Sequence, residues 1–261
     1  MASSYIDFSG VRFHYRIEGP AQAPALVLSN SLGTDLTMWD PQIAELTRHF
    51  RVLRYDTRGH GQTTASPAPY SVEQLGRDVL GLLDVVGIER THFCGLSLGG
   101  MTGMWLAAHE GWRIQRLVLA NTTARMAKPE LYNARIAKVR DGGMGAIVGA
   151  VIERWFTAPF IAEHPDAITP IRMVLERQGA EGYVGGCTAV RDMDQRASIA
   201  TITRPTLVIA GTHDAATPLA DGQLIAQTIP NARFVELPAA HLSNIEAAPQ
   251  FTAAVLDFLQ A

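Results

Sequence analysis

Short apolar segments alternate with longer amphipathic ones along most of this chain. The short segments are rich in β-branched residues, which is typical of buried strands. We therefore predict strands at residues 5–8, 11–17, 25–29, 51–55, 91–94, 116–120, 206–210 and 232–237. Helical segments lie between several of these strands, and parallel strands need such crossover connections. The pattern predicts an α/β fold, with a mainly parallel sheet and helices on both faces.

The best-marked helix begins after Ser71. Ser71 and Gln74 have the spacing of a capping box, which satisfies free backbone N–H groups in the first turn. Gly87 ends the pattern. The apolar positions between them form one stripe: Val72, Leu75, Val79, Leu82, Leu83 and Val86. Such a stripe is buried against a sheet. A similar stripe over residues 251–259 predicts a closing helix.

The alternation of strands and helices stops between residues 125 and 196. That stretch contains several glycines, the aromatic pair Trp155-Phe156 and a helical pattern over residues 132–140. We expect a helical lid inserted after the sixth strand, with residues 1–124 and 197–261 forming the core. An insertion there would cover the carboxyl edge of the sheet, where open α/β folds bind ligands. The alternative is a pair of packed helices without a ligand contact.

Composition narrows the class of protein. The 261 residues are 47% hydrophobic, enough for one sizeable core, and the net charge of −3 argues against a nucleic-acid partner. Cys94 and Cys187 belong to no metal-binding motif, so we expect reduced thiols and no metal site. The sequence has neither a secretory signal pattern nor an apolar run of membrane-spanning length. A cytoplasmic protein without a membrane partner is expected.

The most informative motif is Cys-Gly-Leu-Ser-Leu-Gly-Gly at residues 94–100. It places Ser97 in a Gly-x-Ser-x-Gly frame between an apolar strand and a helical segment. A serine on this tight turn has a strained backbone, and the two glycines leave room for the neighbouring chain. The amide of Leu98, at the start of the helix, can bind an oxyanion. The alternative is a helix cap among flexible glycines.

An acid and a histidine follow in the order that such a serine requires. Asp214 comes just after the strand at 206–210, and His241 comes after the strand at 232–237. Ser97, Asp214 and His241 should therefore meet at one edge of the sheet, and we predict that they form a catalytic triad. Asp194 and Asp221 are alternative acids, but neither follows a strand as directly.

The other histidines are weaker candidates. His213 neighbours the predicted acid but would point away from it in an extended loop. His92 begins a strand, where packing is the expected role. The remaining three that we weighed lie in polar, helical or loop surroundings and are expected to be solvated: His49, His109 and His164.

The whole chain resembles the α/β-hydrolases and, more narrowly, the 3-oxoadipate enol-lactonases of the β-ketoadipate pathway. The narrower resemblance is carried by Ser-Asn-Ser-Leu-Gly-Thr-Asp at 29–35, Cys-Thr-Ala-Val-Arg-Asp at 187–192, Gly-Thr-His-Asp-Ala-Ala-Thr-Pro at 211–218 and Ala-His-Leu-Ser-Asn-Ile-Glu at 240–246. Most α/β-hydrolases have His-Gly where this chain has Asn30-Ser31. The loop Asp-Thr-Arg-Gly-His-Gly at 56–61 is common to the superfamily and says little about the substrate.

The resemblance implies hydrolysis of 3-oxoadipate enol-lactone to 3-oxoadipate without a cofactor. Ser97 would attack the carbonyl through an acyl-enzyme, while the amides of Leu32 and Leu98 bind the oxyanion. Direct attack by water, with His241 as the base, remains open. The lactone carries a carboxylate, and the predicted substrate contacts are Asn30, Ser31, Arg135, Trp155 and Arg191.

Several alternatives stay open at this point. A carboxylesterase, a C–C hydrolase or a perhydrolase would use the same triad. A receptor that keeps the fold without turnover is a further alternative. The sequence does not indicate an oligomeric state.

Overall fold

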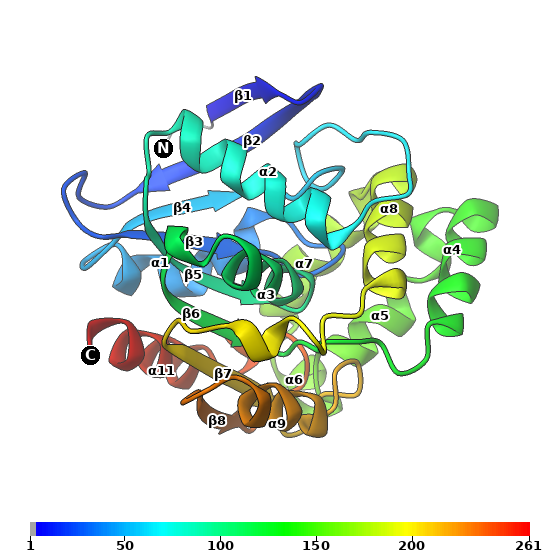
Figure 1. Ribbon diagram of the computed structural model, residues 1–261. Coiled ribbons are helices and arrows are strands. Elements are labelled where there is room, and N and C mark those ends of the chain that lie inside the picture. Colours follow the sequence, from blue (N-terminus) through cyan, green and yellow to red (C-terminus); the bar gives the residue numbers. More distant parts are fainter. Residues whose placement is uncertain (1–3) are drawn as a thin grey trace.

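One eight-stranded sheet runs through the computed structural model, which describes residues 4–261 (Figure 1). The first three residues of the predicted segment 1–124 lie outside this range. The strands are β1 (Ser4–Phe8), β2 (Val11–Glu18), β3 (Ala25–Ser29), β4 (Arg51–Tyr55), β5 (Thr91–Leu96), β6 (Ile114–Ala120), β7 (Thr206–Gly211) and β8 (Arg233–Leu237). Every predicted strand is present, and the ends differ by no more than one or two residues.

The strand order in the sheet is β1-β2-β4-β3-β5-β6-β7-β8. The hairpin β1–β2 and the pair β2–β4 are antiparallel, and all other neighbours are parallel. Each residue of β5 and β7 is buried. Strands covered on both faces lose the alternation of apolar and polar positions, which explains the continuous apolar run in β7.

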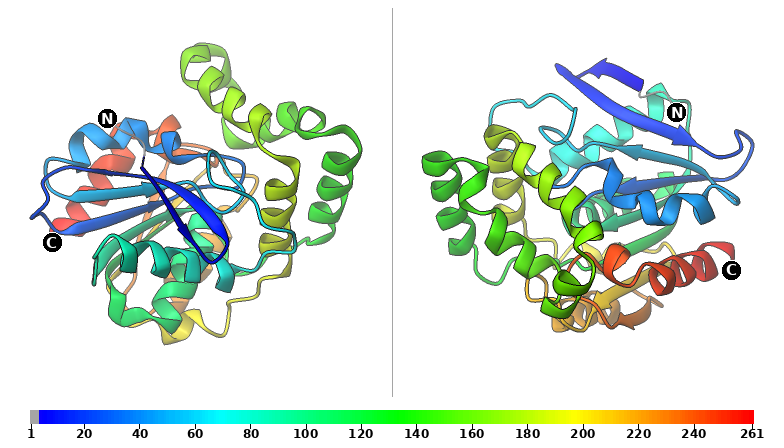
Figure 2. Two further views of the ribbon diagram at one scale, coloured as in Figure 1. Left: turned by 90° about the horizontal axis from the view of Figure 1, so that it is seen from above. Right: turned by 180° about the vertical axis from the view of Figure 1, so that it is seen from behind.

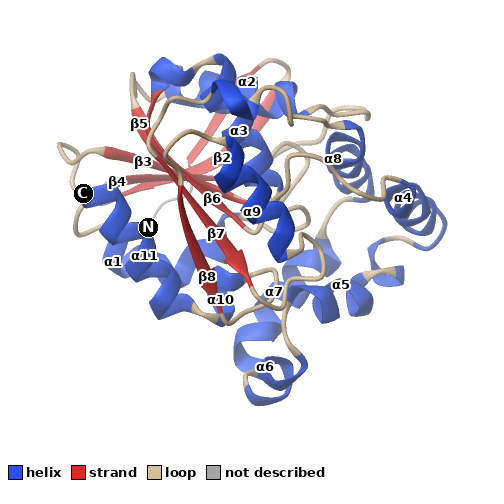
Figure 3. Cartoon of the chain, turned by 60° about the horizontal axis from the view of Figure 1, so that its bottom comes forward, coloured by secondary structure: helices blue, strands red, loops and turns tan. Residues whose placement is uncertain are grey.

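Helices cover both faces of this sheet (Figures 2 and 3). One face carries α2 (Val72–Val85), α3 (Leu98–His109) and α9 (Leu219–Thr228), and the other carries α1 (Asp40–Leu46) and α11 (Ala248–Gln260). The predicted start of α2 is confirmed, because the Ser71 hydroxyl accepts a hydrogen bond from the amide of Gln74 at 3.1 Å. A short helix, α10 (Ser243–Glu246), precedes α11. No helix within residues 4–261 combines the length and the apolar character needed to cross a bilayer.

Five α-helices lie between β6 and β7, in the segment predicted as a lid. They are α4 (Glu130–Gly142), α5 (Val148–Trp155), α6 (Ala158–Glu163), α7 (Pro165–Arg177) and α8 (Ala180–Asp192). Of these, α4, α5 and α8 lie beyond the carboxyl ends of the parallel strands, on the right of Figure 1. Ser97, Asp214 and His241 follow the carboxyl ends of β5, β7 and β8.

Glycines on one face of α8 hold this helix against the core. A Cβ on Gly182 would lie 1.9 Å from the carbonyl oxygen of Gly59, and one on Gly186 would lie 2.5 Å from Cδ1 of Leu32. Gly185 likewise faces the ring of Tyr70, 2.5 Å from an added Cβ. Spacings of three and four residues place the three glycines on the same side of the helix. The backbone of α8 therefore touches the loops that follow β3 and β4.

We expect Gly182→Ala to destabilise the fold by about 1–3 kcal/mol, because the methyl group has no space beside the Gly59 carbonyl. Gly149→Ala is a matched control, since an added Cβ there meets no atom within 4 Å. Urea unfolding of both variants measures the difference. Equal midpoints would show that α8 can move away from the core without cost.

Candidate active site

Ser97 occupies the sharp turn between β5 and α3. Its φ of 57° and ψ of −114° lie outside the usual regions for a residue other than glycine. A Cβ on Gly95 would lie 2.2 Å from the carbonyl oxygen of Gly99, so the turn closes only with glycine at that position. The carbonyl of Ser97 accepts a hydrogen bond from the hydroxyl of Thr122 at 2.8 Å. The predicted strained serine turn is therefore present and held from both sides.

His241 and Asp214 meet beside this turn. The ring nitrogen Nδ1 of His241 lies 2.8 Å from Oδ2 of Asp214, and both side chains are buried. His241 also lines the same cavity as Ser97. The hydroxyl of Ser97 makes no hydrogen bond within residues 4–261. The three residues thus gather as predicted, with the serine hydroxyl free to meet a ligand.

Backbone amides and a hydroxyl surround the carboxylate of Asp214. Oδ1 accepts hydrogen bonds from the amides of Ala216 at 2.7 Å and Thr217 at 3.0 Å, and Oδ2 accepts one from the Thr217 hydroxyl at 2.7 Å. Burial would raise the pKa of Asp214, but the attraction of His241 and these hydrogen bonds outweigh burial and lower that pKa. The group is an anion at neutral pH, suited to orient an imidazole and stabilise its cation.

Asn121 is a residue of the site that the sequence analysis missed. It follows β6 with a φ of 43°, and its side-chain amide donates to Oδ2 of Asp214 at 3.0 Å and to the carbonyl of Ala240 at 3.1 Å. Its side-chain oxygen accepts from the Ser243 hydroxyl at 2.5 Å. Asn121 thereby joins the loops that carry Asp214 and His241. A polar residue at the end of an apolar strand was the available signal.

Two backbone amides near Ser97 are candidates to bind an oxyanion. Leu98 begins α3, and Leu32 lies in the loop after β3; neither amide donates a hydrogen bond to an acceptor in the described chain. The carbonyl of Asn30 accepts from the amide of Gly99 at 2.9 Å, which connects the two segments. A Cβ on Gly99 would lie 2.1 Å from the Ser29 carbonyl oxygen. The geometry is compatible with the predicted oxyanion hole.

The side chain of Asn30 points into the core, in contrast to its predicted substrate contact. It donates to the carbonyl of Tyr55 at 2.7 Å and accepts from Nε1 of Trp39 at 2.9 Å, and it is fully buried. Both ends of the amide are occupied within the protein. Asn30 therefore shapes the loop and does not line the cavity.

The cavity over Ser97 lies between the core and the helices α4 and α5. Three of the predicted substrate contacts line it, namely Ser31, Arg135 and Trp155. Arg154 lines it as well, although the sequence analysis did not select this residue. One Arg154 nitrogen, Nη2, donates to the carbonyl of Ala215 at 3.1 Å, whereas its buried Nε has no acceptor within residues 4–261. Two guanidinium groups thus accompany the catalytic candidates.

Arg191 lies outside this cavity, so its prediction as a substrate contact is not supported by the structure. Its guanidinium pairs with Asp192 at 2.6 and 2.7 Å and donates to Oδ1 of Asn133 at 3.0 Å. These partners lie on α8 and on the outer part of α4. Asp192 and Asn133 are both exposed, so the guanidinium of Arg191 has protein partners at the surface and needs no ligand there.

The rival acids and histidines have other environments. Asp194 is exposed and pairs with Arg196, with 2.7 Å between Oδ2 and Nη2. His213 is exposed, while His92 packs edge-on against Phe50 and has its pKa lowered to about 4 by burial and Arg116. Asp221 lies in the first turn of α9. The predicted solvation of three histidines is confirmed by their exposed side chains: His49, His109 and His164.

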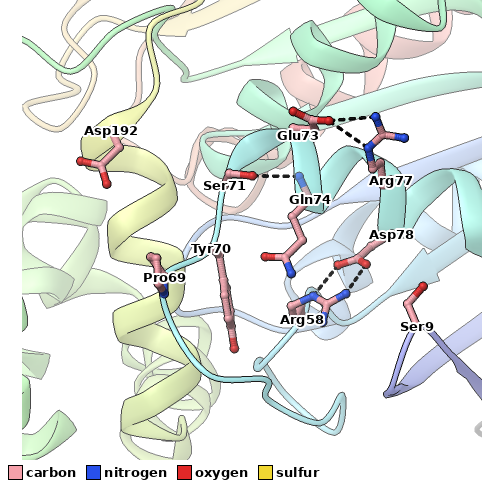
Figure 4. A pocket seen from close by; sticks show the side chains of 10 residues that line it. All are labelled: Ser9, Arg58, Pro69, Tyr70, Ser71, Glu73, Gln74, Arg77, Asp78 and Asp192. Carbon is pink, nitrogen blue, oxygen red and sulfur yellow. Dashed lines mark hydrogen bonds and ion pairs between the residues drawn. The ribbon is translucent and has the colours of Figure 1, made fainter.

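A larger cavity, of about 640 Å³, lies between α2 and the end of α8 (Figure 4). Its only buried charges, Arg58 and Asp78, neutralise each other through hydrogen bonds of 2.5 and 2.8 Å. Ser97 and His241 do not line it. Across residues 4–261, no three histidine, cysteine, aspartate or glutamate side chains gather in a way that could hold a metal ion.

Comparison with known proteins shows to which protein family this chain belongs. A sequence model described as the alpha/beta hydrolase fold matches residues 24–165. The chain belongs to the α/β-hydrolase family, and the protein is a hydrolytic enzyme.

Particular relatives narrow the comparison. The chain is similar to 3-oxoadipate enol-lactonase 2 of Acinetobacter baylyi, with 41% identity over 94% of this chain and 92% of the relative. It is similar to the crystal structure of the enol-lactonase from Burkholderia xenovorans LB400, with 50% identity, a TM-score of 0.98 and coverage of 99% and 100%. A putative carbamate hydrolase RutD of Pseudomonas savastanoi is 35% identical over 92% of this chain and 95% of the relative.

We expect Asn121→Gly, which keeps the positive φ, to destabilise the protein by about 1–3 kcal/mol at pH 7 because the Asp214 carboxylate loses a buried donor. Asp214 has a lowered pKa, so its contribution is complete above the ordinary value of 3.8 and is lost as the pH falls through the folded-state pKa. The difference from wild type should shrink over that range.

Chemical denaturation between pH 7 and pH 3 measures this dependence. Asn231→Gly is the control, because Asn231 also has a positive φ but lies in an exposed turn. A penalty for Asn121→Gly that is no larger than the control's would contradict the positioning role.

Proposed function

We propose that this enzyme hydrolyses 3-oxoadipate enol-lactone to 3-oxoadipate, with Ser97, His241 and Asp214 as its catalytic triad. One observation carries the proposal: the cavity at Ser97 and His241 is also lined by Arg135 and Arg154. This combination suits a small ester that carries a carboxylate. The similarity to enol-lactonases over nearly the whole chain supports the same substrate.

Catalysis begins with proton transfer from the Ser97 hydroxyl to Nε2 of His241. The opposite ring nitrogen is held by Asp214 at 2.8 Å, which fixes the tautomer that can accept this proton. Ser97 Oγ attacks the lactone carbonyl, and the amides of Leu32 and Leu98 donate to the oxyanion. The loss of one such donor costs about 3 kcal/mol of transition-state stabilisation in comparable sites.

Collapse of the tetrahedral intermediate opens the ring and expels an enolate oxygen. An enolate is a better leaving group than an alkoxide. It takes the proton held at Nε2 of His241, which leaves His241 neutral, and the resulting enol becomes a ketone. A water molecule that transfers its proton to His241 then hydrolyses the ester at Ser97. The sequence of steps needs no cofactor.

The lactone carboxylate is bound by Arg135 and Arg154. The buried Arg154 Nε without a protein acceptor supports this role. Ser31 and Trp155 complete the wall around the ring.

We further propose that the segment 125–196 acts as a lid over the site. Both arginines lie on its helices α4 and α5. Residues of α4 and α5 line the cavity at Ser97, so a substrate bound there lies between the core and this segment, away from bulk water.

We expect Ser97→Ala to lower kcat for the enol-lactone by at least about 10⁴-fold, because the variant retains only oxyanion stabilisation and binding. The loss of ultraviolet absorbance of freshly generated lactone measures the rate. Activity of Ser97→Ala close to that of wild type would favour direct attack by water. A wild type that ignores the lactone but cleaves aryl esters would contradict the substrate assignment.

We expect Arg135→Ala and Arg154→Ala to raise KM for the lactone about tenfold, more than for a neutral ester of similar size, because each removes a charge-assisted contact. Arg191→Ala is the matched control from outside the cavity. Steady-state kinetics on both substrates measure the effect. If KM rises equally for the lactone and the neutral ester, these arginines do not recognise the carboxylate.

A further inference from the structure

A second hollow lies beside the active-site cavity, between α4 and α5. We call it the lateral groove, and define it by Ala134, Arg135, Lys138, Ala150 and Arg154. Its free volume of about 200 Å³ is larger than the 40 Å³ directly over Ser97. Ala134, Lys138 and Ala150 are exposed, so its outer end opens to solvent.

The lateral groove and the cavity over Ser97 share part of their walls. Leu131, Arg135, Val151 and Arg154 line both of them. The two arginines therefore stand at the boundary, with the catalytic serine on one side and the groove on the other. A ligand that passes along the groove would meet both guanidinium groups before it reached Ser97.

All charged residues that line the lateral groove are positive. Lys138 joins Arg135 and Arg154, and no carboxylate lines the groove. The nearby acidic residues of α4 and α5 lie elsewhere on these helices: Glu130, Asp141 and Glu153. The whole chain, in contrast, has a net charge of −3. A positively lined cleft in a negative protein concentrates small anions at its mouth.

The sequence makes Lys138 easy to isolate experimentally. The chain contains only two lysines, Lys128 and Lys138. Lys128 precedes α4 and does not line the lateral groove. Lys138 lies within α4 and does line it. The pair offers one charge within the groove and one outside it.

We propose that the lateral groove is the route by which small carboxylates reach Ser97, and that Lys138 attracts them to its outer end. The proposal rests on the proposed lactone substrate, and it adds a path and a steering residue to that site. Lys138 lies outside the cavity at Ser97, so it acts on the approach of the substrate and not on the reacting atoms.

The first test is the salt dependence of kcat/KM for the enol-lactone. At low ionic strength, Lys138→Gln should lower this value about two- to tenfold, as one of three charges in a cleft whose total steering effect is about 10–10³-fold. The decrease should be smaller for a neutral aryl ester and should vanish in about 0.5 M salt, where charges are screened within a few ångströms. Lys128→Gln should behave as wild type.

The second test blocks the route. Ala150→Trp should lower kcat/KM for both the lactone and the neutral ester, because the indole fills the groove that both must pass. Ala162→Trp, on an exposed position of α6, is the control for the added bulk. Unchanged rates for Ala150→Trp would overturn the route. Equal salt dependence of Lys138→Gln and wild type would overturn the steering role.

The two proposals can fail separately. If wild type hydrolyses the lactone and the groove variants match their controls, only the lateral groove is refuted. If wild type does not hydrolyse the lactone, the substrate assignment fails. The same variants then test the groove with a pair of aryl esters that differ in one carboxylate.

Discussion

The close approach of two backbone segments, at Gly99 and at Ser29-Asn30, sets the geometry of the active site. The amide of Gly99 donates to the Asn30 carbonyl at 2.9 Å, and no side chain would fit at Gly99 beside the Ser29 carbonyl oxygen. This contact connects the turn that carries Ser97 to the loop that carries Leu32. The proposed nucleophile and oxyanion donors are therefore placed by backbone at the ends of the adjacent strands β3 and β5, and such fixed placement gives preorganised sites their electrostatic advantage.

Further contacts extend this rigidity to the acid and the histidine. The side chain of Asn121 forms hydrogen bonds with Asp214, with the carbonyl of Ala240 and with the hydroxyl of Ser243. It therefore connects the end of β6 to the segments that carry Asp214 and His241. On the other side, the glycine face of α8 rests on the loops after β3 and β4. Asn121 thus joins the loops that carry Asp214 and His241, whereas α8 holds the loop that carries Leu32. Of the remaining helices in the segment 125–196, α4 and α5 line the cavity at Ser97.

Much of this arrangement could be predicted from the sequence. Parallel strands buried on both faces produce continuous apolar runs, and residues just after such runs must meet at one sheet edge, which located Ser97, Asp214 and His241. Asn121 was missed because its partners lie 93 and 119 residues away in the chain. Arg154 was missed and Arg191 wrongly included, since helical periodicity does not reveal which side of an inserted helix faces the cavity. Asn30 was predicted to contact the substrate, but its side-chain amide forms hydrogen bonds with Tyr55 and Trp39. The sequence around Asn30 does not indicate these partners.

The positive charges of Arg135 and Arg154, placed by α4 and α5, lie in the cavity at Ser97. The proposed triad alone suits many esters, and our assignment of a small anionic ester rests on the two arginines that line the cavity. The most direct test is a competition among 3-oxoadipate enol-lactone, a neutral aryl ester and a simple carbamate, with kcat/KM measured for each on the wild-type enzyme. Our account predicts that the lactone is preferred by at least about 10²-fold, the effect of two charge-assisted contacts. A carbamate or neutral ester that is hydrolysed as efficiently as the lactone would contradict it.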